Sequence, residues 1–394
     1  MKKVWVLFVC VLLGWFLIKV STPFTASYSA IAFAATEEEM YESLDEQLNS
    51  LDMEEYEKVL NALTEQGLLP NIAFKDLVLG LLQGDGLTTE TPAEFFSAIF
   101  QNLWDTVKPI IVLFVVLGIL LGVYKYFSAG RKDLEKVVYF SIYTAVVFIV
   151  VYVVKNAIQT TTLAIDSMHK QMDALFPILL TVLTATGAVK SAGVYQPLAY
   201  VLSQGVASIF SKVLLPLGFM VFVLCIVQSL SSEIKVGKIK SFLSSLLKWG
   251  IGTTCSIFLS VLTMKGVVVS ASDGMSVKLA KYSIKNYVPV LGGYVSDGFE
   301  IVRASSVLLK NAVGVGGIFI VLQSVAVPLL SLMFFQLLFK FLAGILEPVS
   351  DGNLCNFFEE ISKCMKYFFA LVFGVAIMYI FSIAMVIFTA NGVV

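Results

Sequence analysis

The sequence of 394 residues contains a single histidine, His169, and no GxxxxGK[ST] loop of the kind that cradles nucleotide phosphates. One imidazole cannot assemble a histidine-based metal site, and no pair of nucleophile and base stands out elsewhere. We therefore expect no enzymatic activity and no cofactor, and any ATP-driven step should depend on another chain. We also expect no nucleic-acid partner.

Charged residues are scarce as well. They make up 14% of the chain, whereas 58% of the residues are hydrophobic. An average soluble domain carries roughly 25% charged residues, and it needs polar residues to face the solvent. The composition therefore excludes an ordinary water-soluble fold. It predicts an all-α membrane protein, a polytopic bundle of transmembrane helices.

The five cysteines form no disulfide framework and no CxxC pair. Cys10 lies in the N-terminal apolar segment. Cys225 and Cys255 fall inside apolar runs, where a thiol is most often a small hydrophobe. Cys355 and Cys364 are nine residues apart, which would place them on opposite faces of one helix.

Residues 1–34 have the pattern of an export signal. Lys2 and Lys3 are followed by an apolar centre, 4–18, and by an Ala-Phe-Ala cleavage site at 32–34. An uncleaved anchor helix is the alternative. Under either interpretation, we expect the next segment to be exported.

Residues 35–105 are acidic: 16 Asp or Glu stand against 2 Lys or Arg, whereas residues 106–394 carry 12 acidic and 22 basic residues. Such an asymmetry indicates that the two parts lie in different environments. We expect 35–105 to form a small exported helical head. It is short for an independent core, so it should pack on a partner or on the membrane body.

Apolar residues in this head recur with a period near 3.6 and predict a first helix, which Gly67 and Pro70 end. The positions are Leu44, Leu48, Leu51, Val59, Leu60 and Leu63. A second helix is expected over 74–82. A third begins at Thr91, which a capping-box pattern marks as its N-cap.

Residues 106–394 hold the membrane domain, in apolar runs of roughly the 20 residues that a membrane helix needs. The clearest are 109–127, 137–154, 198–230, 249–270, 311–346 and 367–390, with a weaker candidate at 174–192. Pro216 interrupts the third run, and Pro328 is expected to divide the fifth into two joined segments. The sequence predicts six to eight spans.

Lysine and arginine gather near 125–136 and in 231–248. Short basic loops stay in the cytoplasm, which agrees with an exported head. Both loops can be cytoplasmic only if one of the two candidates between 174 and 230 fails to cross the membrane fully. The sequence leaves that count open.

The segment 271–317 is too polar to cross lipid simply and too apolar to be a solvated loop. It begins as a basic amphipathic stretch that proline and paired glycines break. Its candidate pathway or packing residues are Pro289, Gly292, Gly293, Asp297, Glu300, Arg303, Lys310, Asn311 and Gly314. Three interpretations stay open: a helix lying on the membrane surface, the polar lining of a pathway, and a surface that docks a partner.

The same segment carries a family resemblance. The strings KYSIKNYVPVLGGYVSDG at 281–298 and SSVLLKNAVGVG at 305–316 closely resemble the stage III sporulation protein AE family of endospore-forming bacteria. PLGFM at 216–220 and LEPVSD at 346–351 look like the family's strings too. The family favours Phe or Ile before Pro-Val-x-Gly-Gly, where this chain has Tyr287-Val288.

The resemblance implies a multi-pass subunit in the mother-cell membrane surrounding the forespore. It would belong to a channel or secretion-like complex that forespore development needs after engulfment. The implied partners are other proteins of the stage III sporulation A operon, including a cytosolic ATPase and ring-forming subunits, and indirectly stage II sporulation protein Q on the forespore side. A transporter permease for a small solute is the alternative function.

Lys235, Lys238 and Lys240 are the candidate docking residues for that ATPase. They lie in the second basic loop, which is expected to face the cytoplasm. A chain that lacks a nucleotide-binding loop needs such a partner as its source of energy.

Overall fold

The computed structural model describes residues 37–65, 69, 73–83, 104, 108–116, 118–120, 123, 132–230, 236–287, 292–347 and 352–391. The predicted export signal and the predicted head helix from Thr91 lie outside these residues. Lys235 and Pro289 lie outside them as well.

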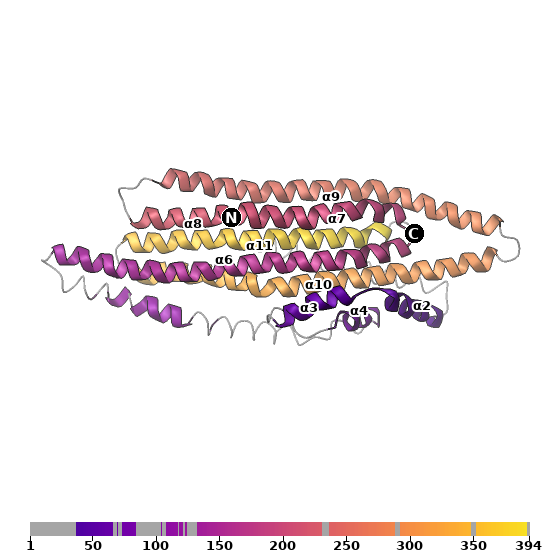
Figure 1. Ribbon diagram of the computed structural model, residues 1–394, viewed down its shortest axis with the longest axis horizontal. Coiled ribbons are helices and arrows are strands. Elements are labelled where there is room, and N and C mark those ends of the chain that lie inside the picture. The colour runs from indigo at the N-terminus through magenta and orange to yellow at the C-terminus, as the bar shows by residue number, and fades with distance from the viewer. Residues whose placement is uncertain are drawn as a thin grey trace.

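Long helical rods make up the body of the protein (Figure 1). The first is α6 (Lys132–Ala185). The second joins α7 (Val189–Ile209), the π-helical turn η1 (Phe210–Leu214) and α8 (Leu215–Leu230). The remaining three are α9 (Gly237–Tyr287), α10 (Gly292–Leu346) and α11 (Gly352–Asn391). The predicted all-α class is confirmed.

Five helices in the described part of the chain are long and apolar enough to cross a membrane. Their apolar portions are Tyr143–Ala185, Gln204–Ser229, Gly237–Thr263, Glu300–Leu346 and Leu354–Thr389. A shorter apolar helical stretch covers Lys108–Leu120. The chain is therefore a polytopic membrane protein, with a span count close to the predicted six to eight.

The weak candidate span at 174–192 is not a separate span. Its first part completes α6, which continues through Pro177 to Ala185, and its last residues begin α7. The chain reverses at Gly187, whose φ of 85° is a left-handed value that glycine adopts without strain.

Pro216 and Pro328, the prolines of the third and fifth apolar runs, have different effects on their helices. The prediction that Pro328 divides its run was wrong, because α10 continues through it as one helix. A proline removes a single backbone hydrogen bond, and packing against neighbouring helices offsets that loss. Next to Pro216 the rod instead forms η1, a local widening that relieves the interrupted bonding pattern.

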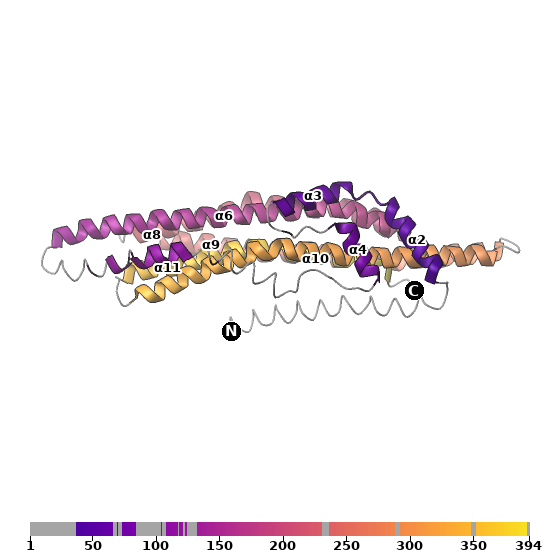
Figure 2. The same ribbon diagram turned by 90° about the horizontal axis from the view of Figure 1, so that it is seen from below.

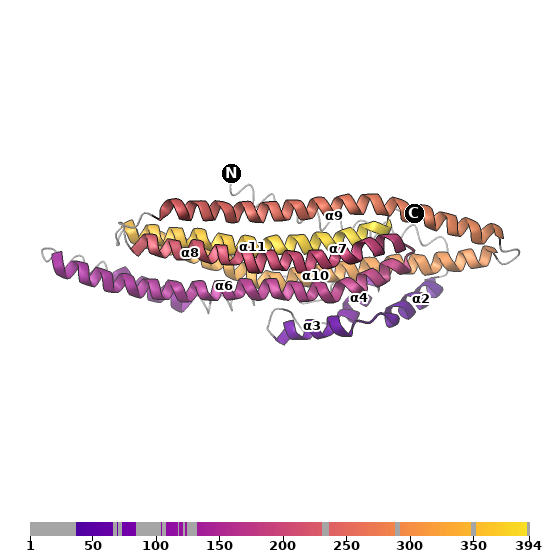
Figure 3. The same ribbon diagram turned by 45° about the horizontal axis from the view of Figure 1, so that its top comes forward.

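The rods lie side by side, and their ends form two groups (Figures 1 and 3). At one end α6, α9 and α11 begin and α8 and α10 end; we call it the basic end. At the other, the head end, α6 and α9 end and α7 and α10 begin. The described parts of the two predicted basic segments, 132–136 and 236–248, both lie at the basic end, because α6 and the α7–α8 rod each traverse the bundle once.

The rods are longer than a bilayer is thick. α6 has 54 residues and α10 has 55. At 1.5 Å per residue each is about 80 Å long, whereas the hydrocarbon core of a bilayer measures about 30 Å. A large part of an upright bundle must therefore lie outside the hydrocarbon.

Three short helices lie along one side of this bundle (Figure 2). α2 (Glu37–Ser50) and α4 (Phe74–Gln83) pack on α10, and α3 (Glu54–Glu65) packs on α6. The predicted first head helix is thus two helices. They separate at Asp52, whose carboxylate accepts a hydrogen bond from the Glu54 backbone N–H and so starts a new helix.

The buried apolar side chains of the head continue the core of the bundle. Tyr56 of α3 is fully buried and meets the Phe74 ring of α4 edge-on, with 4.6 Å between the ring centroids. Burial raises the pKa of the Tyr56 phenol. α4 matches the helix predicted over 74–82, and the head packs on the membrane body.

Glycines bring α10 close to its neighbours. A Cβ added at Gly314 would overlap Ile387 of α11, and one added at Gly317 would overlap Leu175 of α6. Gly316 faces α4. One turn of α10 therefore contacts α4, α6 and α11, and its glycines let these three helices approach closely.

Replacing Gly314 by alanine should lower the melting temperature of the detergent-solubilised chain, because a methyl group has no room beside Ile387. Overpacking of this kind costs about 1–3 kcal/mol. Gly344→Ala is the matched control on the same helix, since nothing lies within 4 Å of its added Cβ. Thermal unfolding followed by size-exclusion fluorescence compares them, and equal melting temperatures would contradict the packing role.

Candidate functional site

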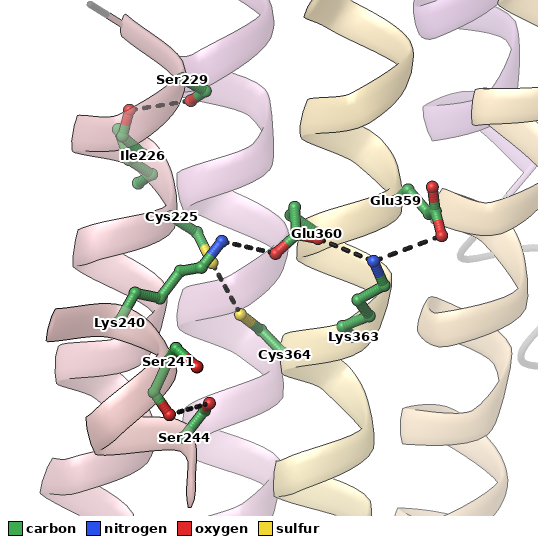
Figure 4. Close-up of polar contacts among 10 residues, drawn as sticks. All are labelled: Cys225, Ile226, Ser229, Lys240, Ser241, Ser244, Glu359, Glu360, Lys363 and Cys364. Carbon is green, nitrogen blue, oxygen red and sulfur yellow. Dashed lines mark hydrogen bonds and ion pairs between the residues drawn. The ribbon is translucent and has the colours of Figure 1, made fainter. Parts of the chain in front are cut away.

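Charged side chains form a network near the basic end, where α8, α9 and α11 meet (Figure 4). Lys240, in the first turn of α9, places its Nζ 2.6 Å from Oε2 of Glu360 on α11. Lys363 Nζ lies 2.7 Å from Oε1 of Glu360 and 3.3 Å from Oε1 of Glu359. Glu360 therefore joins two lysines. We call these four residues the ion-pair cluster.

The link between α9 and α11 is partly withdrawn from water. The side chain of Lys240 is 14% exposed and that of Glu360 is 32% exposed. Such a pair is screened less than a surface pair, and removing one partner leaves the other charge poorly solvated. The ion-pair cluster therefore clamps the start of α9 onto α11.

Two thiols lie beside the ion-pair cluster. The sulfur atoms of Cys225 on α8 and Cys364 on α11 are 3.3 Å apart, and both residues are buried (Figure 4). Both are free cysteines. Their contact is a weak hydrogen bond in which either sulfur can donate, and it brings α8 into the same junction.

A second contact fixes the register of α9 on α11. Lys248 Nζ lies 5.6 Å from the centre of the Tyr367 ring, within the range of a cation–π interaction. Lys240 and Lys248 are about two turns apart on α9, as Glu360 and Tyr367 are on α11. Matching intervals are what two helices running in the same direction require.

At the head end, Lys310 is completely buried in α10. Its Nζ donates a hydrogen bond of 2.6 Å to the main-chain carbonyl of Ile387, close to the end of α11. Lysine side chains commonly bind the last carbonyls of a helix, where the helix dipole favours a positive charge. Lys310 therefore ties α10 to the end of α11.

The neighbouring charged residues of α10 contact other elements. Arg303 is half-buried, and its Nε donates a 3.2 Å hydrogen bond to the Thr186 carbonyl in the turn between α6 and α7. Glu300 is exposed and acts on Arg303 electrostatically. The side chain of Asp297 lies outside the described residues.

Polar residues of the same helix dock the head. Ser306 Oγ donates to Gln47 Oε1 of α2 at 2.8 Å, and Gln47 Nε2 donates to the Val302 carbonyl at 3.3 Å. The hydroxyl oxygens of Ser43 and Ser305 are 3.0 Å apart. These contacts give the buried serines of α10 partners that lipid could not supply.

The structure brings together only some of the residues singled out in 271–317. Lys310 and Gly314 both contact Ile387. Asn311 is buried beside them, with no hydrogen-bond partner for its Oδ1. α9 ends at Tyr287 and α10 begins with Gly292 and Gly293, where a break in the helix was expected.

The ion-pair cluster and the polar residues of α10, which we call the α10 cluster (Arg303, Ser305, Ser306 and Lys310), hold helices together. Their contacts join lysine to carboxylate, lysine to a carbonyl and hydroxyl to amide, each from a different element. Within the described ranges, no group of three or more His, Cys, Asp or Glu residues could hold a metal ion. The contacts of these two clusters therefore hold helices in position relative to one another.

Sequence reasoning missed the junction at the basic end. Its partners are far apart in the chain, by 120 residues for Lys240 and Glu360 and by 139 for Cys225 and Cys364. No local sequence pattern indicates such contacts. Lys240 therefore belongs to an internal contact, and its role in docking the ATPase stays a prediction. Lys238 is exposed.

The single changes Lys240→Met and Glu360→Gln should each destabilise the chain, because each leaves the other partner without its closest countercharge. We expect about 1–3 kcal/mol for a pair that is partly exposed, less than a fully buried pair would cost. The double variant should lose less than the sum of the two. Chemical denaturation in detergent measures this coupling, and strictly additive losses would show that the pair contributes nothing.

Lys310→Met should also lower the melting temperature. Methionine keeps most of the buried volume but cannot donate to Ile387, and a buried polar group left without its partner costs about 1–3 kcal/mol. Lys170→Met is the control, because Lys170 is exposed on α6. The same thermal assay compares them; a Lys310→Met variant as stable as the control would show that Lys310 does not hold α11.

Comparisons with known proteins identify relatives of this chain. A family model described as stage III sporulation protein AE matches residues 72–390. A curated relative, stage III sporulation protein AE of Bacillus subtilis (strain 168), is 27% identical over 331 residues, which cover 82% of this chain and 82% of the relative. No solved structure matches. The matched region includes both clusters.

Proposed function

Because this chain belongs to the stage III sporulation protein AE family, we propose that it is the membrane subunit of a channel or secretion-like complex linking mother cell and forespore. The complex would support forespore development after engulfment. The subunit would lie in the mother-cell membrane surrounding the forespore, and it would act without enzymatic activity of its own.

The length of the bundle carries this proposal. Helices of about 80 Å reach far beyond the hydrocarbon of one bilayer, and the head packs on the outside of the bundle toward the end opposite the basic loops. A subunit that connects a membrane with proteins in the space next to it needs such an extension.

The charge distribution supports an orientation for this subunit. The basic end would lie in the cytoplasm of the mother cell, because lysines and arginines gather in the loops there. The head end and the acidic head would face the forespore. The ring-forming partners and stage II sporulation protein Q are proposed to lie on that side, and the ATPase on the other.

Imaging and deletion test the proposal in the sporulating native host. A tagged chain at native expression should concentrate in the membrane around the engulfed forespore, and its deletion should arrest development after engulfment. An even distribution in vegetative cells, together with normal sporulation, would contradict it.

A solitary permease is the second candidate, because Lys310 and Asn311 are polar residues buried between apolar helices. Purified chain in liposomes separates the two functions. A permease alone should move a small solute, whereas a subunit of a larger complex should move none until its partners are added.

Charge reversal of Lys235 and Lys238 should weaken co-purification with the ATPase several-fold, because each change places a negative charge where an acidic partner surface is expected. Lys240 is left unchanged, since its reversal would break the internal pair with Glu360. Lys190→Glu, an exposed change at the opposite end of the bundle, is the control. Undiminished recovery of the ATPase would rule out docking at this loop.

A further inference from the structure

A groove runs between the last part of α6 and the first part of α7. Its volume is about 1120 Å³. Buried apolar side chains, among them Met172, Phe176 and Ala192, form its floor, and exposed residues such as Asp173 and Thr181 form its rim. The groove is large enough for several side chains of a partner, and both of its walls are helices.

Two prolines line this groove. Pro177 belongs to α6 and Pro197 to α7, and each lies inside its helix. A proline has no N–H, so each helix lacks one backbone donor at this level.

The hydroxyl groups of the rim are hydrogen-bond acceptors. Thr181 Oγ1 donates its hydrogen to the Pro177 carbonyl at 2.9 Å, and Thr184 Oγ1 donates to the Thr181 carbonyl at 2.7 Å. With their hydrogens used in this way, both oxygens can offer only lone pairs to a ligand. The rim therefore favours a group that donates hydrogen bonds.

Asp173 adds a negative charge to these acceptors. Its carboxylate lies 3.3 Å from His169 Nε2 and accepts a 3.4 Å hydrogen bond from Gln204, yet 42% of the side chain remains exposed. An exposed carboxylate beside hydroxyl oxygens is a set of acceptors to which a lysine or arginine side chain can donate.

The groove does not face bare lipid. Asp166, Lys170 and Asp173 are all exposed on α6 within about two turns, and charged side chains directed into hydrocarbon are costly. This side of α6 therefore faces water or another protein. Water would leave the apolar floor of the groove exposed, whereas a protein segment can cover the floor and bind the rim.

Gly193 indicates that the segment is a helix. Nothing lies within 4 Å of a Cβ added there, so the bare backbone of α7 is open to a close approach. Small residues of this kind let a neighbouring helix pack against the backbone. We propose that the groove binds a helix of another protein that presents a lysine or arginine among apolar residues. The proposal does not rest on the channel function.

A photo-crosslinking amino acid, p-benzoylphenylalanine, placed at Thr181 tests this assignment in sporulating cells of the native host. Mass spectrometry then identifies the captured peptide. The expected result is a helix-forming segment of another protein with lysine or arginine between apolar residues. Capture of lipid alone, of a second copy of this chain or of a segment without a basic residue would overturn the proposal.

Affinity measurements on the full chain in nanodiscs complete the test, with the captured segment as a synthetic peptide. Asp173→Asn should weaken binding at least about tenfold, because a charge-assisted hydrogen bond is lost. Gly193→Phe should abolish binding by filling the groove in space that is open in this structure. Asp166→Asn is the matched control on the same helix and should leave the affinity unchanged. Equal affinities for the Asp173 variant and the wild type would refute the role of the carboxylate.

Discussion

The close approach of α10 to α11 is the contact on which the rest of the structure depends. At one level of the bundle, Ile387 of α11 fits against the bare backbone of Gly314 and accepts the hydrogen bond of Lys310. The adjoining turns of α10 carry α4, α6 and α2. Hydrocarbon cannot satisfy a buried polar group, so such groups must meet one another across helices, and each contact then fixes the position of two elements.

The two polar clusters divide this task between the ends of the bundle. Near the basic end, the ion-pair cluster and Lys248 hold α9 in register on α11. Toward the head end, Arg303 and Lys310 bind main-chain carbonyls of the α6–α7 turn and of α11. Rods much longer than a bilayer is thick need such ties at both ends, because lipid supports only their middle. The arrangement suits a subunit that connects a membrane with structures on both of its sides.

Local patterns predicted the fold class and much of the chain's organisation. The apolar runs marked membrane helices, a second head helix was predicted over 74–82 where α4 lies, and the strings at 281–316 identified the family. The number of separate rods was harder to predict. Pro177 and Pro328 usually signal an end to a helix in water, but within a packed bundle both remain inside α6 and α10. Periodicity predicted one head helix where the structure has α2 and α3, which separate at Asp52.

The sequence by itself determined that the chain enters a membrane, which of its loops are basic, and to which family it belongs, because composition, charge and short strings are local properties. Only the tertiary structure decided what the polar residues do. Lys240 meets Glu360 across 120 residues of sequence, and Lys310 meets the Ile387 carbonyl across 77. The groove with Asp173 and two prolines forms only because Gly187 folds α7 back along α6. Contacts between distant segments depend on how the helices pack, and packing is settled by the shape of the whole bundle.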